Sequence, residues 1–358
     1  MSQKPSSLLS NFQSYKVVIP VVIGLGVVVF MFWGELSEAG AALSGVSLSG
    51  RFWGFLALAV MFMAGRDMGY MLRLRLLSEG ELSWRQALRV VVLWEFTSAI
   101  TPSAVGGTSV AILYVNKEGI SLGRSTAIVM ATSLLDEIYF VLMFPLLALV
   151  VSPALLFAGS TPAGEALLWA TLAGYGIKLS WVLLLMYGLF VRPHSLRWLL
   201  VKLFSLPILR RWKQGAAKVG DDVVASASAL RHRSAGFWLR SLAATFVSWT
   251  SRYWVVNALM LAFALSPDHL LVFARQLVMW IMMLVSPTPG GSGFAEFVFK
   301  TFLGDLIPVA GLTVVIALLW RFITYYLYLI VGVMVAPGWI KNKFGKSKKN
   351  VDTIQPEE

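Results

Sequence analysis

The chain contains no cysteine, and its three histidines do not form a recognisable site. Without cysteine, neither a disulfide nor a thiolate-held metal is available. The residues His194, His232 and His269 lie far apart and show no HExxH-type spacing, so the sequence predicts neither a metal nor another cofactor. A glycine-rich nucleotide loop is also missing, which argues against direct ATP drive within this chain.

Charged residues are scarce as well. They make up 13% of the 358 residues, whereas soluble domains carry about 25%. Hydrophobic residues make up 58% of the chain, and its mean hydropathy is +0.74. This composition is typical of a membrane protein that crosses the bilayer several times, and no segment is long and polar enough to form a soluble domain.

The net charge of +12 could indicate nucleic-acid binding, but the positions of the basic residues favour another interpretation. Most lysines and arginines fall in five short segments: 1–16, 73–89, 116–124, 192–238 and 341–358. Basic loops mark the cytoplasmic side of membrane proteins. We therefore expect no nucleic-acid partner and a topology in which all five segments face the cytoplasm.

Apolar stretches long enough to span a bilayer occur at 17–34, 52–72, 124–151, 166–191, 239–264 and 309–336. The first resembles a signal peptide in position, and Ala39-Gly40-Ala41 could be a cleavage site. Its apolar run is longer than the roughly 7–15 residues usual for a signal peptide, so we interpret it as a retained helix.

Two further apolar regions, 90–116 and 271–304, are interrupted by proline and paired glycines. A helix rarely continues through such residues, because proline lacks a donor and diglycine has little helical preference. If each region crossed once, the basic segments could not share one side, so we predict hairpins that enter and leave by the same face. The residues of the two breaks are Pro102, Gly106, Gly107, Pro287, Pro289, Gly290, Gly291 and Gly293.

An alternative interpretation of these glycines is close packing between helices. Close packing would not require the flanking prolines, so a non-helical crossing is favoured. Paired broken helices in corresponding halves of a chain indicate the binding site of a transporter.

The expected fold is an all-α polytopic membrane protein with six full spans and two re-entrant broken hairpins, arranged as an inverted repeat. It forms a single domain, 17–336, with repeat halves 17–151 and 166–336. The remaining parts are a cytoplasmic N-terminus (1–16), a basic cytoplasmic loop (192–238) and a basic cytoplasmic tail (337–358). Part of the loop is amphipathic, which favours an interfacial helix.

Ionisable residues inside the expected spans are unusually frequent. Such residues are costly in a membrane and are functional candidates by default. They are Arg66, Glu95, Asp136, Glu137, Lys178, Arg252, Glu296 and Arg321. One interpretation is that they only pair internally, for instance Asp136 or Glu137 with Arg321. The other is that they line a polar cavity for a charged headgroup.

The two broken motifs carry a resemblance to a known family. Residues 286–296 read SPTPGGSGFAE, which resembles the late motif of the lysylphosphatidylglycerol synthase transmembrane-region, or flippase-like, family. The segment from Glu95 to Pro102 with Gly106-Gly107 is similar to the family's first motif, and Arg66 with Arg73 or Arg75 is similar to its arginines at the end of the second helix. The resemblance covers 17–336.

This resemblance implies movement of a lipid or lipid-linked headgroup between leaflets. Fused family members also carry a C-terminal aminoacyltransferase domain, but this chain ends at Glu358 after a basic tail. We therefore expect the translocating part without the synthase activity, and no catalytic residues.

The leading hypothesis is a flippase or scramblase of the bacterial inner membrane, with both termini cytoplasmic. The arginines Arg66, Arg252 and Arg321 would bind a lipid phosphate, because guanidinium groups form bidentate pairs. The carboxylates would hold these arginines in place. A homodimer is one arrangement that this architecture allows. The alternatives are a transporter of a small anionic solute and a membrane-embedded lipid-headgroup enzyme.

Overall fold

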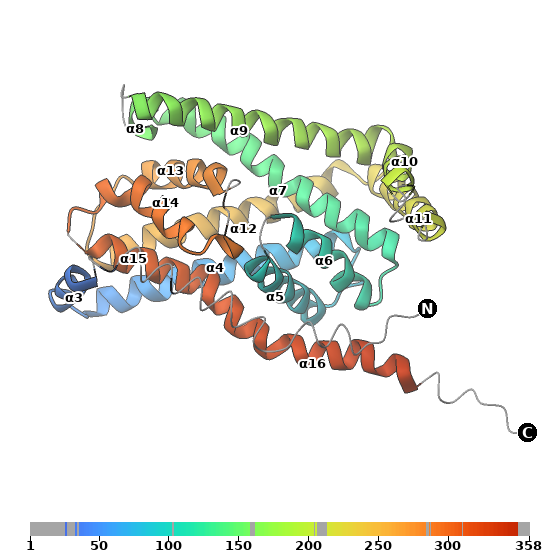
Figure 1. The fold of residues 1–358 in the computed structure, drawn as a ribbon, viewed down its shortest axis with the longest axis horizontal. Coiled ribbons are helices and arrows are strands. Elements are labelled where there is room, and N and C mark those ends of the chain that lie inside the picture. Colours follow the sequence, from blue (N-terminus) through green and yellow to red (C-terminus); the bar gives the residue numbers. More distant parts are fainter. Residues whose placement is uncertain are drawn as a thin grey trace, which may run out of the picture.

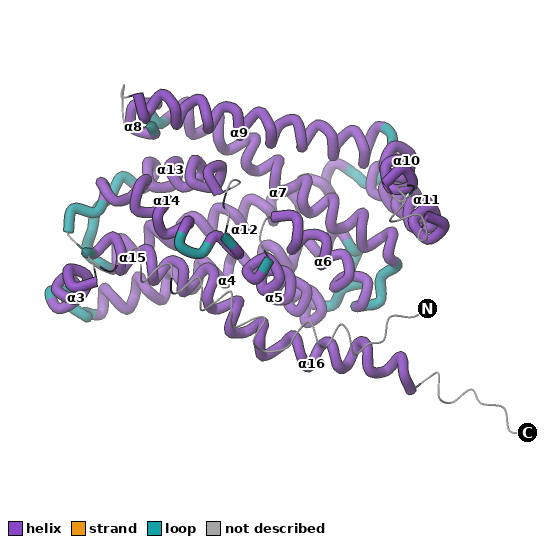
Figure 2. The backbone as a smooth tube through the Cα atoms, viewed as in Figure 1, coloured by secondary structure: helices purple, strands orange, loops and turns teal. Residues whose placement is uncertain are grey.

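The structure, a computed structural model, describes residues 36–101, 104–157, 162–203, 213–283, 288–309 and 311–349, together with the single residues 26, 33, 205 and 286. Within these ranges the regular elements are all helices and no strand occurs (Figure 2). Several sequence-based predictions fall outside the described residues. They concern most of the expected span 17–34, both ends of the chain (1–16 and 350–358), Pro102 and Pro287.

The first half of the chain contributes α3 (Leu36–Ser44), α4 (Gly50–Leu77), α5 (Trp84–Ile100), α6 (Ala104–Lys117) and α7 (Leu122–Val150). A tight turn with left-handed Glu79 and Gly80 ends α4. Then Ser83 and Gln86 form a capping box that starts α5, each side chain bonding to the backbone nitrogen of the other. This short connection brings α5 back alongside α4.

The second half contributes a longer series of elements. They are α8 (Pro153–Leu156), α9 (Pro162–Met186), η2 (Tyr187–Val191), α10 (Pro193–Leu203), α11 (Lys213–Arg231), α12 (Ala235–Ala262), α13 (His269–Met282), η5 (Pro289–Gly291), α14 (Phe294–Leu303), η6 (Gly304–Leu306), α15 (Leu312–Arg321), η7 (Phe322–Tyr326) and α16 (Leu327–Lys349). Figure 1 shows α9 along one edge of the molecule and α16 along the opposite edge.

Four described helices are long and apolar enough to cross a membrane: 50–77, 122–150, 164–191 and 312–343. They match four of the expected spans. The expected span 239–264 forms α12, which is long but is not among these four. Its many serines and threonines, together with Arg240 and Arg252, lower its hydropathy.

Helix α16 continues past the expected tail boundary at 336 to Lys349, so the first part of the expected tail is helical; the boundary itself stays a prediction. The expected loop 192–238 is also largely helical. Its helices α10 and α11 lie together at one end of the molecule (Figure 1). They pack closely, since a Cβ atom on Gly220 would lie 2.8 Å from the Arg197 side chain, and one on Gly123 of α7 would lie 2.0 Å from Asp222 of α11. The segment is a helical pair docked on α7.

Helices α4 and α12 pack against each other over much of their length. A Cβ atom on Gly69 would lie 2.7 Å from the carbonyl oxygen of Ala244, so only glycine permits this approach. At the same crossing, the hydroxyl of Ser248 donates to the carbonyl oxygen of Arg66 at 2.9 Å. The second helix of each expected half thus faces its counterpart, as an inverted repeat predicts; the symmetry itself stays a prediction.

Candidate functional site

The end of α5, which precedes the first break, lies beside the second break. Helix α5 ends at Ile100 and α6 begins at Ala104, while the second break separates α13 from α14. The hydroxyl of Tyr325, in η7, donates to the carbonyl oxygen of Ala99 at 3.0 Å. A Cβ atom on Gly290 would lie only 2.6 Å from that same oxygen. The end of α5 and the second break are therefore in direct contact.

The second break depends on glycine for its backbone conformation. The φ angles of Gly290, Gly291 and Gly293 are 58°, 71° and 80°, all in the left-handed region that other residues rarely adopt. After the break, the amide of Gly293 donates to the carboxylate of Glu296 at 2.8 Å, which caps the start of α14. This departure from regular helix lies at proline and glycine residues that the sequence analysis selected, and its role as a membrane crossing stays a prediction.

The first break differs from the expectation. Gly106 and Gly107 lie within α6, so they do not form the non-helical crossing. A Cβ atom on Gly107 would lie 2.0 Å from the hydroxyl oxygen of Ser98 and 3.0 Å from its Cβ. For Gly107 the close-packing interpretation is therefore correct: the glycine allows α6 to fold back onto α5.

A buried ion pair holds the second break to the last span. The Nε atom of Arg321 donates to Glu296 at 3.0 Å, and its Nη2 atom donates to the carbonyl oxygen of Gly290 at 2.9 Å. The guanidinium carbon lies 3.9 Å from the centre of the Tyr325 ring. The side chain of Glu296 is fully buried and that of Arg321 is 6% exposed. The donors of Arg321 are thus directed at groups of the protein itself.

The charges do pair internally, but Arg321 does not pair with Asp136 or Glu137, the example given for that interpretation. Asp136 instead accepts from Arg73 at 2.5 and 3.2 Å and from the Trp249 indole at 2.5 Å. Glu137 accepts from Lys178 at 2.6 Å. Adjacent residues on a helix point about 100° apart, so the two carboxylates reach different neighbours.

A third group of charges lies between α4, α5, α12 and α16. Arg66 donates to Asp67 at 2.8 Å and also pairs with Glu95. The hydroxyl of Tyr328 donates to both carboxylate oxygens of Asp67, at 2.7 and 2.8 Å. We call Arg66, Asp67, Glu95, Arg252 and Tyr328 the central cluster. Its two arginines and two carboxylates balance in charge.

Within the central cluster, Arg252 is held far less firmly than Arg66. Its Nη1 atom lies 3.8 Å from Glu95, which is longer than a hydrogen bond, and its guanidinium carbon lies 5.7 Å from the Trp249 ring. Over the part of the chain that the structure describes, its guanidinium donates no hydrogen bond. Its side chain is 21% exposed, against 4% for Arg66. Arg252 is therefore available to a ligand.

The structure brings together several residues that the sequence analysis did not select. Each of four such residues contacts a predicted site residue: Asp67, Tyr328, Tyr325 and Trp249. A signal was present for Asp67, because it follows Arg66 directly inside an apolar stretch. No signal marked the tyrosines or the tryptophan, since aromatic residues are common throughout this chain.

Another buried carboxylate, Glu118, lies in the turn between α6 and α7, outside the spans. It accepts from Arg89 at 2.9 and 3.2 Å, from the Trp339 indole at 2.9 Å and from Lys343 at 2.9 Å. Burial alone would raise the pKa of this carboxyl group, but these hydrogen bonds outweigh burial and hold the pKa of Glu118 below its usual value. Glu118 thus fastens the end of α16 to the α5–α6 hairpin.

The chain is similar to known membrane proteins. Residues 17–332 match the family described as the lysylphosphatidylglycerol synthase TM region. The chain is also similar to a UPF0104 membrane protein of Archaeoglobus fulgidus, with 26% identity over 309 residues. That similarity covers 83% of this chain and 90% of the relative.

Proposed function

Because this chain belongs to the lysylphosphatidylglycerol synthase TM region family and is a multi-pass membrane protein, we propose that it translocates a polar lipid. It would act as a flippase or scramblase, moving a lipid with an anionic or zwitterionic headgroup between the leaflets of the inner membrane. The observation that supports this most is the availability of Arg252 inside the helix bundle.

The proposal assigns phosphate binding to Arg252. A guanidinium group stays charged and offers paired donors that match phosphate oxygens. Arg66 and Arg321 have the same chemistry, but carboxylates and carbonyl oxygens already occupy their donors. The nearby Glu95 and Trp249 would keep Arg252 in position without neutralising it fully, because the distance of 3.8 Å to Glu95 leaves room for a competing anion.

The proposal also requires the breaks to separate. In this conformation Gly290 and Tyr325 are packed against the carbonyl oxygen of Ala99. A headgroup that passes between α5 and the second break would have to replace this hydrogen bond with one of its own. Transport proteins with broken helices commonly alternate between such states. We therefore interpret the described conformation as one with the path between the breaks closed.

The test is lipid movement in proteoliposomes. We expect Arg252→Gln to abolish leaflet exchange of a fluorescent phospholipid, measured by quenching from outside, while the protein remains folded. Arg240→Gln is a matched control, since Arg240 is an exposed arginine near the start of the same helix. Undiminished exchange in Arg252→Gln would contradict the assignment.

Two further outcomes would contradict a lipid translocase. Recovery of a chemically altered lipid would indicate a headgroup enzyme. Uptake of radiolabelled phosphate into the same liposomes, lost in Arg252→Gln, without any lipid exchange would indicate a transporter of small anions. We expect lipid to be recovered unchanged and no phosphate uptake.

A further inference from the structure

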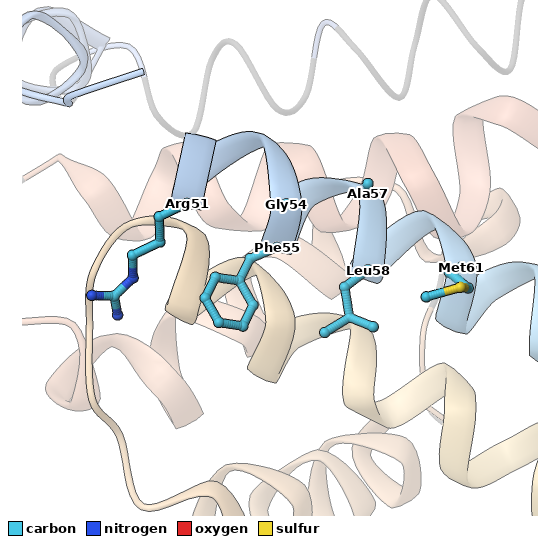
Figure 3. Close-up of a pocket in the computed structure, with 6 residues that line it drawn as sticks. All are labelled: Arg51, Gly54, Phe55, Ala57, Leu58 and Met61. Atoms are coloured by element: carbon cyan, nitrogen blue, oxygen red, sulfur yellow. The ribbon is translucent and has the colours of Figure 1, made fainter. Parts of the chain in front are cut away.

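An open groove runs along the first turns of α4. It has a volume of about 440 Å³ and is lined by Arg51, Gly54, Phe55, Ala57, Leu58 and Met61. Figure 3 shows Arg51, Phe55 and Leu58 projecting from the same side of the helix. Apart from the arginine, every lining residue is apolar. The groove therefore combines a hydrocarbon-like floor with a single positive charge at one end.

Small residues create the groove. Gly54 has no side chain, and a Cβ atom placed there would have no neighbour within 4 Å. Ala57 adds only a methyl group, whereas Phe55, Leu58 and Met61 extend beyond it. The groove lies on one of the four helices that can cross a membrane, on residues that are exposed or half-buried. An exposed apolar groove at such a position is open to a lipid acyl chain.

In the part of the chain that the structure describes, Arg51 lies near an aromatic ring and not near a carboxylate. Its guanidinium carbon lies 5.8 Å from the Phe55 ring. Across the described ranges of the chain, no carboxylate pairs with Arg51 and no hydrogen bond from it occurs. By contrast, Arg66, Arg73 and Arg321 each pair with a carboxylate. A guanidinium without a carboxylate partner beside an apolar groove is suited to bind an amphipathic anion, which has a negative group and an apolar part.

The length of α4 places Arg51 at the level of lipid headgroups. The helix has 28 residues, which corresponds to about 42 Å, close to the roughly 40–45 Å of a bilayer with its headgroups. Arg51 is its second residue, and Arg75 lies near the opposite end, where it covers the Trp84 ring at 4.3 Å. The groove itself begins at Arg51 and runs toward the middle of the helix, which is the direction of an acyl chain.

We propose that this groove binds one phospholipid with a net negative headgroup. The phosphate would pair with Arg51, and one acyl chain would lie over Gly54 and Ala57 toward Met61. This site is separate from the central cluster, because Arg66 lies on the buried face of α4 whereas the groove opens outward. The bound lipid would be a resident partner of the protein, independent of whether a lipid is translocated.

The experiment uses the full-length protein in phosphatidylcholine nanodiscs that contain photoreactive phosphatidylglycerol with a diazirine in its acyl chain. After irradiation, labelled peptides are mapped by mass spectrometry. We expect labelling concentrated in residues 50–61, and excess unlabelled phosphatidylglycerol should suppress it more than excess phosphatidylcholine does. The readout does not depend on transport, so it holds or fails separately from the translocase proposal.

Two substitutions, each with a control variant, test the phosphate-binding and the acyl-chain-binding parts of the site. Arg51→Gln should lower the labelling of 50–61 about fivefold, the change in affinity expected for one basic residue near an anionic membrane surface. Arg51→Lys should retain most of the labelling. Gly54→Leu should remove the labelling by filling the groove, while Ala64→Leu, an exposed site on the same helix outside the groove, should leave it unchanged.

Three results would overturn the proposal. The first is labelling that is the same in Arg51→Gln and Gly54→Leu as in the wild type. The second is equal competition by phosphatidylglycerol and phosphatidylcholine. The third is absent labelling in the wild type, together with disulfide formation between Gly54→Cys and a cysteine introduced within 17–34, which would identify that segment of the chain as the occupant. The lack of native cysteines makes this cross-link unambiguous.

Discussion

Arg321 and Arg252 are both arginines in helices of the membrane domain, but they differ in exposure and in how many of their donors are occupied. Arg321 is 6% exposed, donates to Glu296 and Gly290, and stacks on Tyr325. Arg252 is 21% exposed and lies 3.8 Å from its only carboxylate neighbour among the described residues. A charge with its donors occupied holds a structure together. An arginine whose donors are free can bind a ligand. The two arginines can therefore have different roles although they are the same residue type.

The largest effect is expected from breaking the Arg321–Glu296 pair. Removing one partner of a buried ion pair leaves the other charge uncompensated, which typically costs about 3–5 kcal/mol. We expect Glu296→Gln to lower the melting temperature in detergent strongly. The double substitution Glu296→Gln with Arg321→Met should recover part of the loss. A single variant as stable as the wild type would show that the pair does not hold the second break.

The next largest effect is expected at Gly290, where comparison with a control variant distinguishes backbone strain from steric contact. Gly290→Ala would force a residue with a Cβ atom into a left-handed φ of 58° and within 2.6 Å of the Ala99 carbonyl oxygen. We expect a loss of about 2–3 kcal/mol in the free energy of unfolding. Gly80→Ala is the matched control, because its φ of 82° imposes strain but nothing lies within 4 Å.

Gly80→Ala should therefore cost only about 1 kcal/mol. Equal losses in the two variants, measured by thermal unfolding, would show that the contact between the breaks contributes nothing to stability.

Glu118, which lies outside the spans, is expected to make a pH-dependent contribution to stability. Its pKa is lowered in the folded protein, so it binds protons less readily there than in the unfolded chain. Its contribution to stability is complete above the unfolded pKa and is lost as the pH falls through the lower, folded pKa. We expect Glu118→Gln to cost about 1–2 kcal/mol at neutral pH.

Melting curves of the wild type and Glu118→Gln should converge as the pH is lowered below about 4, the ordinary pKa of a glutamate. A difference that stays constant, or that grows, with acidification would contradict the role of Glu118 as a charged acceptor for Arg89, Trp339 and Lys343.

The smallest effect is expected at Tyr328. The substitution Tyr328→Phe removes the hydrogen bonds to Asp67 but leaves Arg66 paired with both carboxylates. We expect a loss of about 1 kcal/mol in stability and a partial reduction of lipid exchange. Complete loss of exchange without loss of stability would instead place Tyr328 in direct contact with the lipid.

Several features of the fold could be predicted because they leave a pattern in the sequence itself. Apolar length located the four candidate spans, and proline with paired glycines located the second break. The same signal misplaced Gly106 and Gly107, since glycine serves close packing and left-handed backbone equally well, and only the observed contact with Ser98 distinguishes the two. In the segment 192–238 the amphipathic pattern indicated one helix, whereas the structure has two, α10 and α11.

For the candidate site, the sequence predicted many of the residues but not which of them pair with each other. Charged residues inside apolar stretches are conspicuous, which identified both Arg252 and Arg321. The partners of these residues depend on which helices face each other and on the rotation of each helix about its axis. The spacing of residues along the sequence does not determine either of these. Asp136 and Glu137 are neighbours in sequence but bind Arg73 and Lys178 on different helices. The distinction between an occupied and a free arginine therefore required the structure.

The most direct test measures Arg252→Gln and Arg321→Gln side by side in both assays. Lipid exchange in proteoliposomes reports function, and the melting temperature in detergent reports stability. We predict that Arg252→Gln abolishes lipid exchange while the free energy of unfolding changes by less than about 0.5 kcal/mol. For Arg321→Gln we predict instead a clear decrease in melting temperature. Retained lipid exchange in a fully folded Arg252→Gln protein would contradict the central claim that this free arginine binds the translocated lipid.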